Sequence, residues 1–205
     1  AGVDQYLQLG LRFILRHMGM QFTRYQQYIW EKEQVLDRVL QPHYNVVEVG
    51  SFRGESLLQI QQKSAGGLHY IFEPLPSYHR KLVRTFGHHR CPIMRIALSN
   101  YDGVALFNFV ETNPQFSGLK FWRYGKYESA EKYFIRVRML DTLLPAHHPV
   151  HLIKIEAEGG ELSILQGAVE TLQRYKPIVL FEYRRPPARF YHQHSTMLYE
   201  LLRSE

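Results

Sequence analysis

Short apolar stretches alternate with amphipathic stretches along most of the chain, and this alternation predicts an α/β fold. Two segments near the start, 4–18 and 26–40, carry apolar residues at helical spacing, and Pro42 ends the second one. Five near-continuous apolar stretches then predict strands, at 45–50, 69–74, 92–99, 151–158 and 177–183. Apolar strands separated by amphipathic helices are typical of a parallel sheet covered on both faces, so we expect a doubly wound sheet.

Helical patterns fill most of the gaps between these strands. Helices are predicted from Ser56, from Ser77 and over 161–175. The rhythm changes in the middle of the chain, where VALFNFV and YFIRVRML predict two added strands around a polar, tyrosine-rich loop at 113–132. The expected fold is therefore a doubly wound sheet with an insertion.

Composition narrows the classes of protein that fit. The chain has 205 residues, 45% hydrophobic and 21% charged, so we expect a helical lead over 1–44 and one domain over 45–205. The formal charge of +6 and the pI near 9.4 favour anionic partners, whether a phosphorylated substrate, a nucleic acid or a membrane surface. A single cysteine, Cys91, excludes an intrachain disulfide and a cysteine-based zinc site. The sequence shows neither an apolar run of ~20 residues nor a signal-peptide core, so we expect a cytoplasmic location.

Candidate chemistry begins where the first predicted strand ends in Glu-x-Gly-x-x-x-Gly. Gly50 and Gly54 allow the backbone to turn sharply and approach a ligand, and the start of the next helix presents free N–H groups. Glu48 and Glu55 would repel a pyrophosphate, so a ligand with an amino group and a ribose fits better. Glu73 ends the second strand, where an acid can accept hydrogen bonds from ribose hydroxyls. Together these residues predict nucleoside binding.

Five segments extend this pattern over most of the chain: VVEVGSFRGES, YIFEPLPSYHRKL, ALSNYDGVALF, RVRMLDTLL and LIKIEAEGGELSILQGAVETLQRYKPIVLFEY. They resemble the FkbM-type S-adenosylmethionine-dependent methyltransferases over roughly 46–183. The most specific element is Lys-Ile-Glu-x-Glu-Gly-x-Glu, although the family commonly has Asp where this chain has Glu48 and Glu156. The resemblance implies a Rossmann-like methyltransferase fold with its strands in the order third, second, first, fourth, fifth.

The same resemblance implies that S-adenosylmethionine is the methyl donor and co-substrate. By this reading, the methionine part lies on Glu48, Gly50, Ser51 and Gly54, the ribose on Glu73, and the adenine beside Ala97, Leu98 and Ser99. The donor's chemistry agrees, because it has an ammonium group for Glu48, two ribose hydroxyls for Glu73 and no phosphate.

The acceptor side is predicted after the fourth strand. Lys154, Glu156 and Glu158 stand at alternate positions, hence on one strand face, and Glu161 follows on the first turn of the next helix. Methyl transfer to a hydroxyl needs alignment and a base, which Glu158 or Glu161 could supply. Lys154 could keep a carboxylate ionised or orient the acceptor, and Glu156 is a candidate acceptor-binding residue.

Two other roles remain open for these residues. Lys154 and Glu156 could instead form a buried pair, with Glu161 favouring the helix start. The carboxylates could also hold a divalent cation, but a metal is not favoured because the ligand spacing fits no known pattern.

The segment after the fifth strand is basic. Its sequence, EYRRPPARFYHQH, carries Arg184 and Arg185, which would suit an anionic acceptor; a solvated basic loop is the alternative. The histidines have no metal-binding spacing and are expected at the surface. A full methyltransferase sheet has two more strands, yet one helix-like segment follows Tyr183, so we expect a truncated or minimal sheet.

We therefore expect an S-adenosylmethionine-dependent enzyme that methylates a hydroxyl of a small molecule, such as a sugar or a polyketide-like product. A methyltransferase acting on RNA or another macromolecule, and a non-catalytic nucleoside-binding module, are the alternatives. A nicotinamide or flavin oxidoreductase is disfavoured because Phe52 replaces the second glycine of the dinucleotide-binding pattern.

Overall fold

The computed structural model describes residues 24–121, 129–145, 147–183, 191 and 194–204. The chain divides into two compact units, Ala1–Val39 and Leu40–Glu205. The described part of the first unit is helix α2, Arg24–Val39, which confirms the helix predicted over 26–40. The helix predicted over 4–18 lies outside the described residues, as do Arg184 and Arg185.

The second unit is built on a parallel sheet. Its strands are β1 (Val46–Val49), β2 (His69–Phe72), β3 (Ile93–Met94), β7 (Leu152–Ile155) and β8 (Ile178–Phe181). Their spatial order is β3-β2-β1-β7-β8, and every neighbouring pair is parallel. This confirms the predicted order of third, second, first, fourth, fifth. Val49 at the end of β1 is level with Phe72 of β2 and Ile155 of β7, so these three strands end together.

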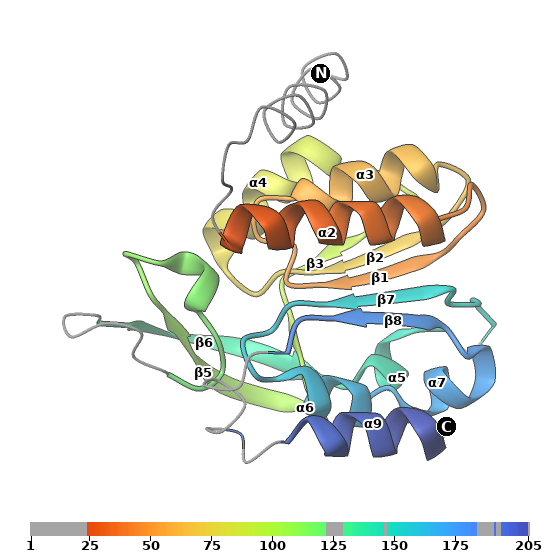
Figure 1. The fold of residues 1–205 in the computed structure, drawn as a ribbon. Coiled ribbons are helices and arrows are strands. Elements are labelled where there is room, and N and C mark those ends of the chain that lie inside the picture. The colour runs from red at the N-terminus through yellow and green to blue at the C-terminus, as the bar shows by residue number, and fades with distance from the viewer. Residues whose placement is uncertain (1–23, 122–128, 146, 184–190, 192–193, 205) are drawn as a thin grey trace. The chain divides into compact units, whose positions relative to one another are not determined.

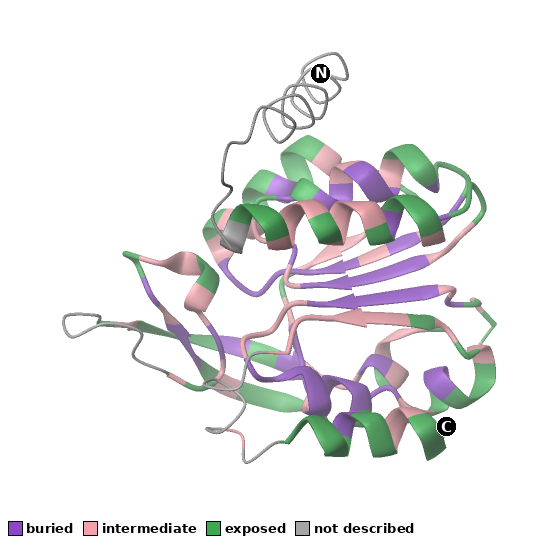
Figure 2. Ribbon diagram, in the orientation of Figure 1, coloured by how far each residue is buried: buried purple, intermediate pink, exposed green. Residues whose placement is uncertain are grey.

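Helices cover both faces of this sheet (Figure 1). One face carries α3 (Glu55–Lys63) and α4 (Pro76–Phe86); the other carries α5 (Leu140–Leu143), α6 (Glu161–Gln166), α7 (Val169–Tyr175) and α9 (Ser195–Ser204). Figure 2 shows β1 and β7 buried along their whole length, as continuous apolar strands in the middle of a doubly covered sheet should be. Within the described residues, no helix has the length and apolarity needed to cross a membrane.

Side chains alternate between the two faces along β1 and β7. Val47 and Val49, together with Ile153 and Ile155, join the apolar core formed with α6, α7 and α9. Glu48 and Lys154, which are level with each other, project from the opposite side of the pleat. The alternation therefore places one acid and one base at the middle of the sheet, on the face that α3 covers.

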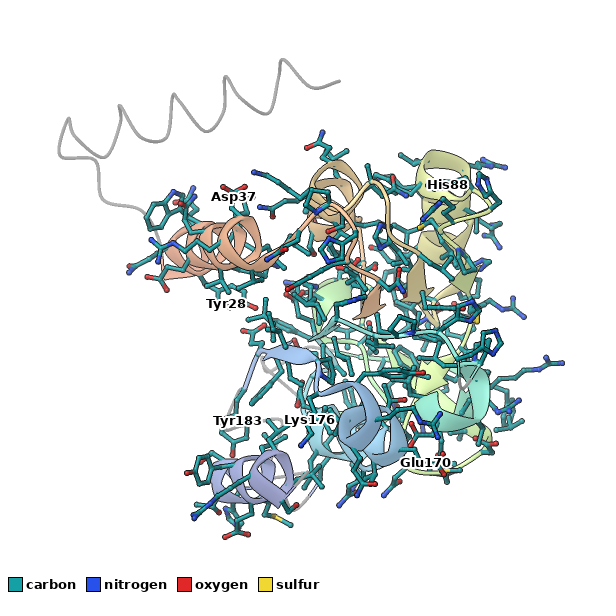
Figure 3. All side chains as sticks on the ribbon, turned by 90° about the vertical axis from the view of Figure 1, so that its right-hand side faces the viewer. Tyr28, Asp37, His88, Glu170, Lys176 and Tyr183 are labelled. Atoms are coloured by element: carbon teal, nitrogen blue, oxygen red, sulfur yellow. The ribbon has the colours of Figure 1, made fainter. Side chains whose placement is uncertain are left out.

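The single helix predicted over 161–175 is two helices, α6 and α7. They separate at Gly167, where a Cβ atom would lie 2.0 Å from the Ser99 carbonyl oxygen. The Asp141 N–H donates to the Gly167 carbonyl, and the Asp141 carboxylate accepts from the N–H and hydroxyl of Thr171. Contacts with distant segments therefore interrupt a pattern that is locally helical. Lys176, labelled in Figure 3, ends α7 at φ 46° and ψ 53°, and β8 follows.

The strand predicted over 92–99 is also divided, between two sheets. After β3, the chain crosses to a second sheet as β4 (Ala97–Leu98), where it pairs in parallel with β6 (Glu131–Arg138). The third strand is β5 (Gly103–Phe109), antiparallel to β6, and the order is β4-β6-β5. Strands β5 and β6 are the two added strands predicted from the sequence. Figure 1 shows the second sheet on the side where β7 leads into α6.

Candidate functional site

A tight loop joins β1 to α3 at the carboxyl edge of the parallel sheet. Gly50 and Gly54 have φ angles of 79° and 84°, a region that glycine adopts without strain. A Cβ atom on Gly50 would lie 2.0 Å from the carbonyl oxygen of Glu156, so the loop runs against the backbone that follows β7. Helix α3 begins after Gly54 without a side-chain cap, which leaves the N–H groups of its first turn facing the loop. The two glycines therefore allow the sharp turn expected from the sequence, and the approach of a ligand to this loop stays a prediction.

Glu48 lies beneath this loop with no solvent exposure. Its Oε1 atom accepts a hydrogen bond from the Ser56 hydroxyl at 2.7 Å and lies 3.0 Å from Nζ of Lys154. Its Oε2 atom is buried and has no hydrogen-bond partner among the described residues. The hydroxyl of Ser51, in the loop itself, is likewise buried without a partner there. Two buried polar atoms in the predicted donor site therefore lack a hydrogen-bond partner among the described residues.

Lys154 connects the two halves of the site. Its ammonium group is 1% exposed and lies 3.0 Å from Glu48 and 3.3 Å from Glu156. Burial alone would lower the pKa of Lys154, but the charges of Glu156 and Glu48 outweigh it and hold this pKa above its ordinary value. The lysine is therefore a permanent cation between two carboxylates. The expected ion pair of Lys154 and Glu156 is present, although only Lys154 is fully buried, and Glu48 extends the pair to a triad.

Glu73 follows β2 and is buried. Its two oxygens accept the N–H groups of Phe52, at 3.0 Å, and Leu75, at 2.9 Å. Desolvation raises the pKa of Glu73 to about 7, while these two hydrogen bonds act in the opposite direction. The carboxylate thus ties the loop after β1 to the end of β2, and each oxygen retains a lone pair for a further donor such as a ribose hydroxyl.

Ala97, Leu98 and Ser99 are buried between the two sheets. Leu98 belongs to the apolar core of the parallel sheet, while Ala97 belongs to the cluster beneath the second sheet, together with Leu75. The Ser99 N–H donates to the carbonyl of Arg138. The predicted contact of these three residues with adenine stays a prediction; their observed role is to join the sheets.

The acids after β7 do not share a strand face, because β7 ends at Ile155. Glu158 lies in the turn that follows, partly exposed and with a left-handed φ of 46°. Glu161 is buried at the start of α6, and its Oε1 atom accepts the N–H groups of Ala157 and Gly159, both at 3.2 Å. Desolvation raises the pKa of Glu161 in spite of these bonds. Glu161 therefore holds the turn that presents Glu158.

A tyrosine that the sequence pattern did not single out also lies at this turn. The hydroxyl oxygen of Tyr191 accepts the N–H of Lys120 at 3.1 Å and is 3.9 Å from the position of a Cβ on Gly160. Burial raises the pKa of Tyr191, and the charges of Glu161 and Glu158 raise it further. Tyr191 is one of the aromatic residues of the basic segment EYRRPPARFYHQH, which was the one sequence feature that could have drawn attention to it. Nothing in the sequence predicts its contact with Lys120.

The described residues contain no group of three or more His, Cys, Asp or Glu side chains arranged to hold a metal ion. The polar groups that the described residues bring together at the site are carboxylates, one buried lysine and the backbone N–H groups of two loops. Acids at the ends of β1 and β2 beside a glycine loop suit a cationic nucleoside better than a nucleotide phosphate.

The fold is that of an α/β protein of the Rossmann-like class, with a glycine loop after its first strand. The sequence pattern of the methyltransferase FkbM domain matches residues 48–204, and the chain belongs to this family. Among solved structures, it is similar to the methyltransferase FkbM from Methylobacillus flagellatus KT, with 18% identity and a TM-score of 0.52. The match covers 78% of this chain and 38% of that one. None of the curated proteins compared with the chain matches it.

Proposed function

We propose that this protein uses S-adenosylmethionine to methylate a hydroxyl group of a small molecule. The observation that carries the proposal is the pair of buried, unpartnered atoms beside the glycine loop, Glu48 Oε2 and Ser51 Oγ. A buried polar atom without a partner costs free energy, which a bound ligand can recover. Membership of the FkbM family supports methyl transfer as the reaction class.

The residues present fit this donor. S-adenosylmethionine supplies a methyl group on a positively charged sulfur, together with an ammonium, a carboxylate and a ribose. Glu48 Oε2 would accept from the ammonium group, Ser51 and the first N–H groups of α3 would donate to the carboxylate, and Glu73 would accept from the ribose hydroxyls. Lys154, itself held as a cation, lies 3.0 Å from Glu48 Oε1 and leaves Oε2 for the ammonium group of the donor.

On the acceptor side, we assign the general base to Glu158 and a positioning role to Glu161. One oxygen of Glu161 accepts hydrogen bonds from two backbone N–H groups of the turn after β7. Glu158 lies in this turn and is partly exposed. As the acceptor oxygen forms its bond to the methyl carbon, its proton passes to Glu158 and the electron pair of the breaking S–C bond stays on sulfur. Alignment of the acceptor supplies the larger part of the rate increase.

Lys154 and Glu156 complete the proposed acceptor side. Glu156 is partly exposed, with its side chain 25% accessible, and pairs with Lys154 at 3.3 Å. It can therefore face an acceptor while Lys154 fixes its carboxylate. A nucleic acid acceptor is the second candidate, and the formal charge of +6 favours it.

Two measurements test the proposal. Titration calorimetry with S-adenosylhomocysteine and with NAD should show binding of the first and none of the second. Ser51→Ala should weaken S-adenosylhomocysteine binding by about 1 kcal/mol, the usual value of one hydrogen bond, while Ser77→Ala, an exposed control, leaves it unchanged. Binding of NAD in place of the adenosyl ligand would disprove the donor assignment.

The acceptor is then sought with donor that carries a labelled methyl group. Candidates are sugars, polyketide-like alcohols, lipids and RNA, and we expect label in a small hydroxyl compound. Label that enters RNA would favour a nucleic acid acceptor over a small hydroxyl compound. Donor binding without transfer to any of them would favour a nucleoside-binding module.

A further inference from the structure

A cavity of about 600 Å³ lies between α4, the end of β3 and the strands β5 and β6. None of the residues that line it belongs to the proposed donor or acceptor groups. Its origin is the crossing of the chain from one sheet to the other. Ile93 and Met94 pair with β2, Ala97 and Leu98 pair with β6, and the intervening Arg95 and Ile96 pair with neither. The two sheets diverge at this crossing, and the cavity occupies the gap.

The open edge of β6 forms one side of this gap. On that edge, β4 pairs with Val137 and Arg138 alone, and within the described residues no strand continues the pairing toward Glu131. Phe134, Ile135 and Arg136 of this stretch line the cavity. The unpaired edge thus leaves room for a ligand.

The cavity's apolar walls are unusually exposed for side chains of this size. Phe134 is 80% exposed and Val104, from the neighbouring strand, is 65% exposed. Single exposed apolar residues are common, but here they adjoin further apolar walls from Met94 and Ile96. Covering Phe134 and Val104 with an apolar ligand would remove this surface from water, which is favourable.

The charged walls of the cavity are all basic. Arg95 and Arg136 are exposed at its rim, and neither forms an ion pair with a carboxylate in the described part of the chain. His79 lies on the α4 side, and its Nε2–H donates to the Ile93 carbonyl at 3.1 Å, which fixes the ring. None of the described residues that line the cavity is acidic. Two guanidinium groups beside an apolar hollow match an anion with an apolar body.

We propose that this cavity binds a small amphipathic anion, an aromatic or alkyl compound with one carboxylate, sulfonate or phosphate group. The volume lies within the range of about 300–1,000 Å³ that is usual for small-molecule sites. The anionic group pairs with Arg95 and Arg136, and the apolar body covers Phe134 and Val104. The site is independent of the methyl donor, because it shares no residue with the donor loop.

The test uses two fluorescent probes of nearly the same shape, 1-anilinonaphthalene-8-sulfonate and its uncharged analogue N-phenyl-1-naphthylamine. The sulfonate should bind the wild-type protein in a one-to-one complex, and more tightly than the uncharged probe. Arg95→Gln and Arg136→Gln should each weaken binding of the sulfonate about tenfold and leave the uncharged probe unchanged. Phe134→Ser should weaken both probes.

Matched controls separate the cavity from the surface at large. Lys132→Gln removes the same charge from the same strand, two residues from Phe134 and outside the cavity, and should have no effect. Val83→Ser removes an exposed apolar side chain from α4 and should also have none. Thermal melts identify any variant that fails to fold. Arg95, Arg136 and Lys132 are exposed polar residues, so their substitution should not disturb folding. The comparison of the arginine variants with Lys132→Gln therefore decides the test.

Three outcomes would overturn the proposal. An equal loss of sulfonate binding in Lys132→Gln would show attraction to overall charge rather than to a site. Displacement of the probe by S-adenosylhomocysteine would make the cavity part of the donor site. Binding of many probe molecules per chain, insensitive to both arginines, would show general adsorption to apolar surface.

Discussion

The ammonium group of Lys154 on β7 lies 3.0 Å from the carboxylate of Glu48 on β1, and both side chains are buried in the middle of the sheet. They meet because the two residues are level in adjacent parallel strands. A carboxylate directly beneath the glycine loop is thereby paired with a buried cation. The pair links the loop after β1 to Glu156 beyond β7, so it joins the two halves of the site.

Removal of the lysine charge should destabilise the protein strongly. Lys154→Met leaves Glu48 and Glu156 without their cation, and an uncompensated buried charge of this kind costs about 3–5 kcal/mol. Urea unfolding should show this loss. The double variant Lys154→Met with Glu48→Met should recover much of it, because the fully buried carboxylate is removed together with its cation and Glu156 is partly exposed. A loss below about 1 kcal/mol, as expected for the exposed control Lys132→Met, would show that the pair is not structural.

Gly50→Ala should damage the loop after β1. The new Cβ would lie 2.0 Å from the Glu156 carbonyl oxygen, and the φ of 79° is strained for alanine. We expect a loss of about 2 kcal/mol or more in the free energy of unfolding, together with weaker S-adenosylhomocysteine binding. Gly103→Ala is the control, because its Cβ would be 3.6 Å from the Tyr101 ring and its φ is ordinary. Equal stability of the two variants would contradict the observed packing of the loop.

The elements that depend on local pattern were predicted well. Continuous apolar strands and amphipathic helices reveal themselves in short windows of sequence, and the strand order followed from the family resemblance. The segments 92–99 and 161–175 were predicted as continuous elements, but contacts with distant parts of the chain divide each of them. Gly167 interrupts a helical pattern because Ser99 reaches it from another part of the chain, and 92–99 divides because a second sheet captures Ala97 and Leu98.

The candidate site shows the same division. The buried pair of Lys154 and Glu156 was foreseen as one alternative, since the two residues alternate along one strand. The contact of Lys154 with Glu48 could not be predicted, because it depends on the register between β1 and β7, which the sequence pattern does not specify. The contact of Tyr191 with Lys120 joins segments far apart in the chain, and the cavity at the sheet crossing depends on where 92–99 divides.

Glu73 should make stability depend on pH near neutrality. Its pKa is raised from 4.5 to about 7 on folding, so between these values the folded protein binds more protons at this site than the unfolded chain does. The free energy of unfolding contributed by Glu73 therefore falls as pH rises through this window, by about 3 kcal/mol in all. Urea midpoints from pH 4.5 to 8 should show this fall in the wild-type protein.

The variant Glu73→Gln isolates this effect. It should be less stable than wild type near pH 4.5, because its amide NH₂ would face one of the N–H groups of Phe52 and Leu75. The difference between the two proteins should shrink as pH rises, since the variant has no proton to lose. Parallel pH profiles for the two proteins would show that Glu73 does not titrate in this range.

The last prediction concerns the two acids after β7, which the structure places in different surroundings. Glu158→Gln keeps the size of a partly exposed side chain in the turn and removes the base, so turnover should fall by ~10²–10⁴ with donor affinity unchanged. Glu161→Gln should instead lower the melting temperature, because the neutral amide oxygen accepts the N–H groups of Ala157 and Gly159 more weakly than a carboxylate oxygen does.

Turnover, donor affinity and melting temperature of both variants, with and without a chelator, distinguish the possible roles. A base gives loss of turnover in a protein that melts normally. A positioning residue gives a lower melting temperature and partial turnover, which Glu161→Asp does not restore, because aspartate keeps the charge but is one methylene too short to reach the same N–H groups. Activity lost on chelation and restored by Mg²⁺ or Mn²⁺ would instead indicate a metal held by the carboxylates. Full turnover in both variants would mean that neither acid takes the acceptor's proton, and alignment beside the Lys154–Glu156 pair would then have to account for the rate.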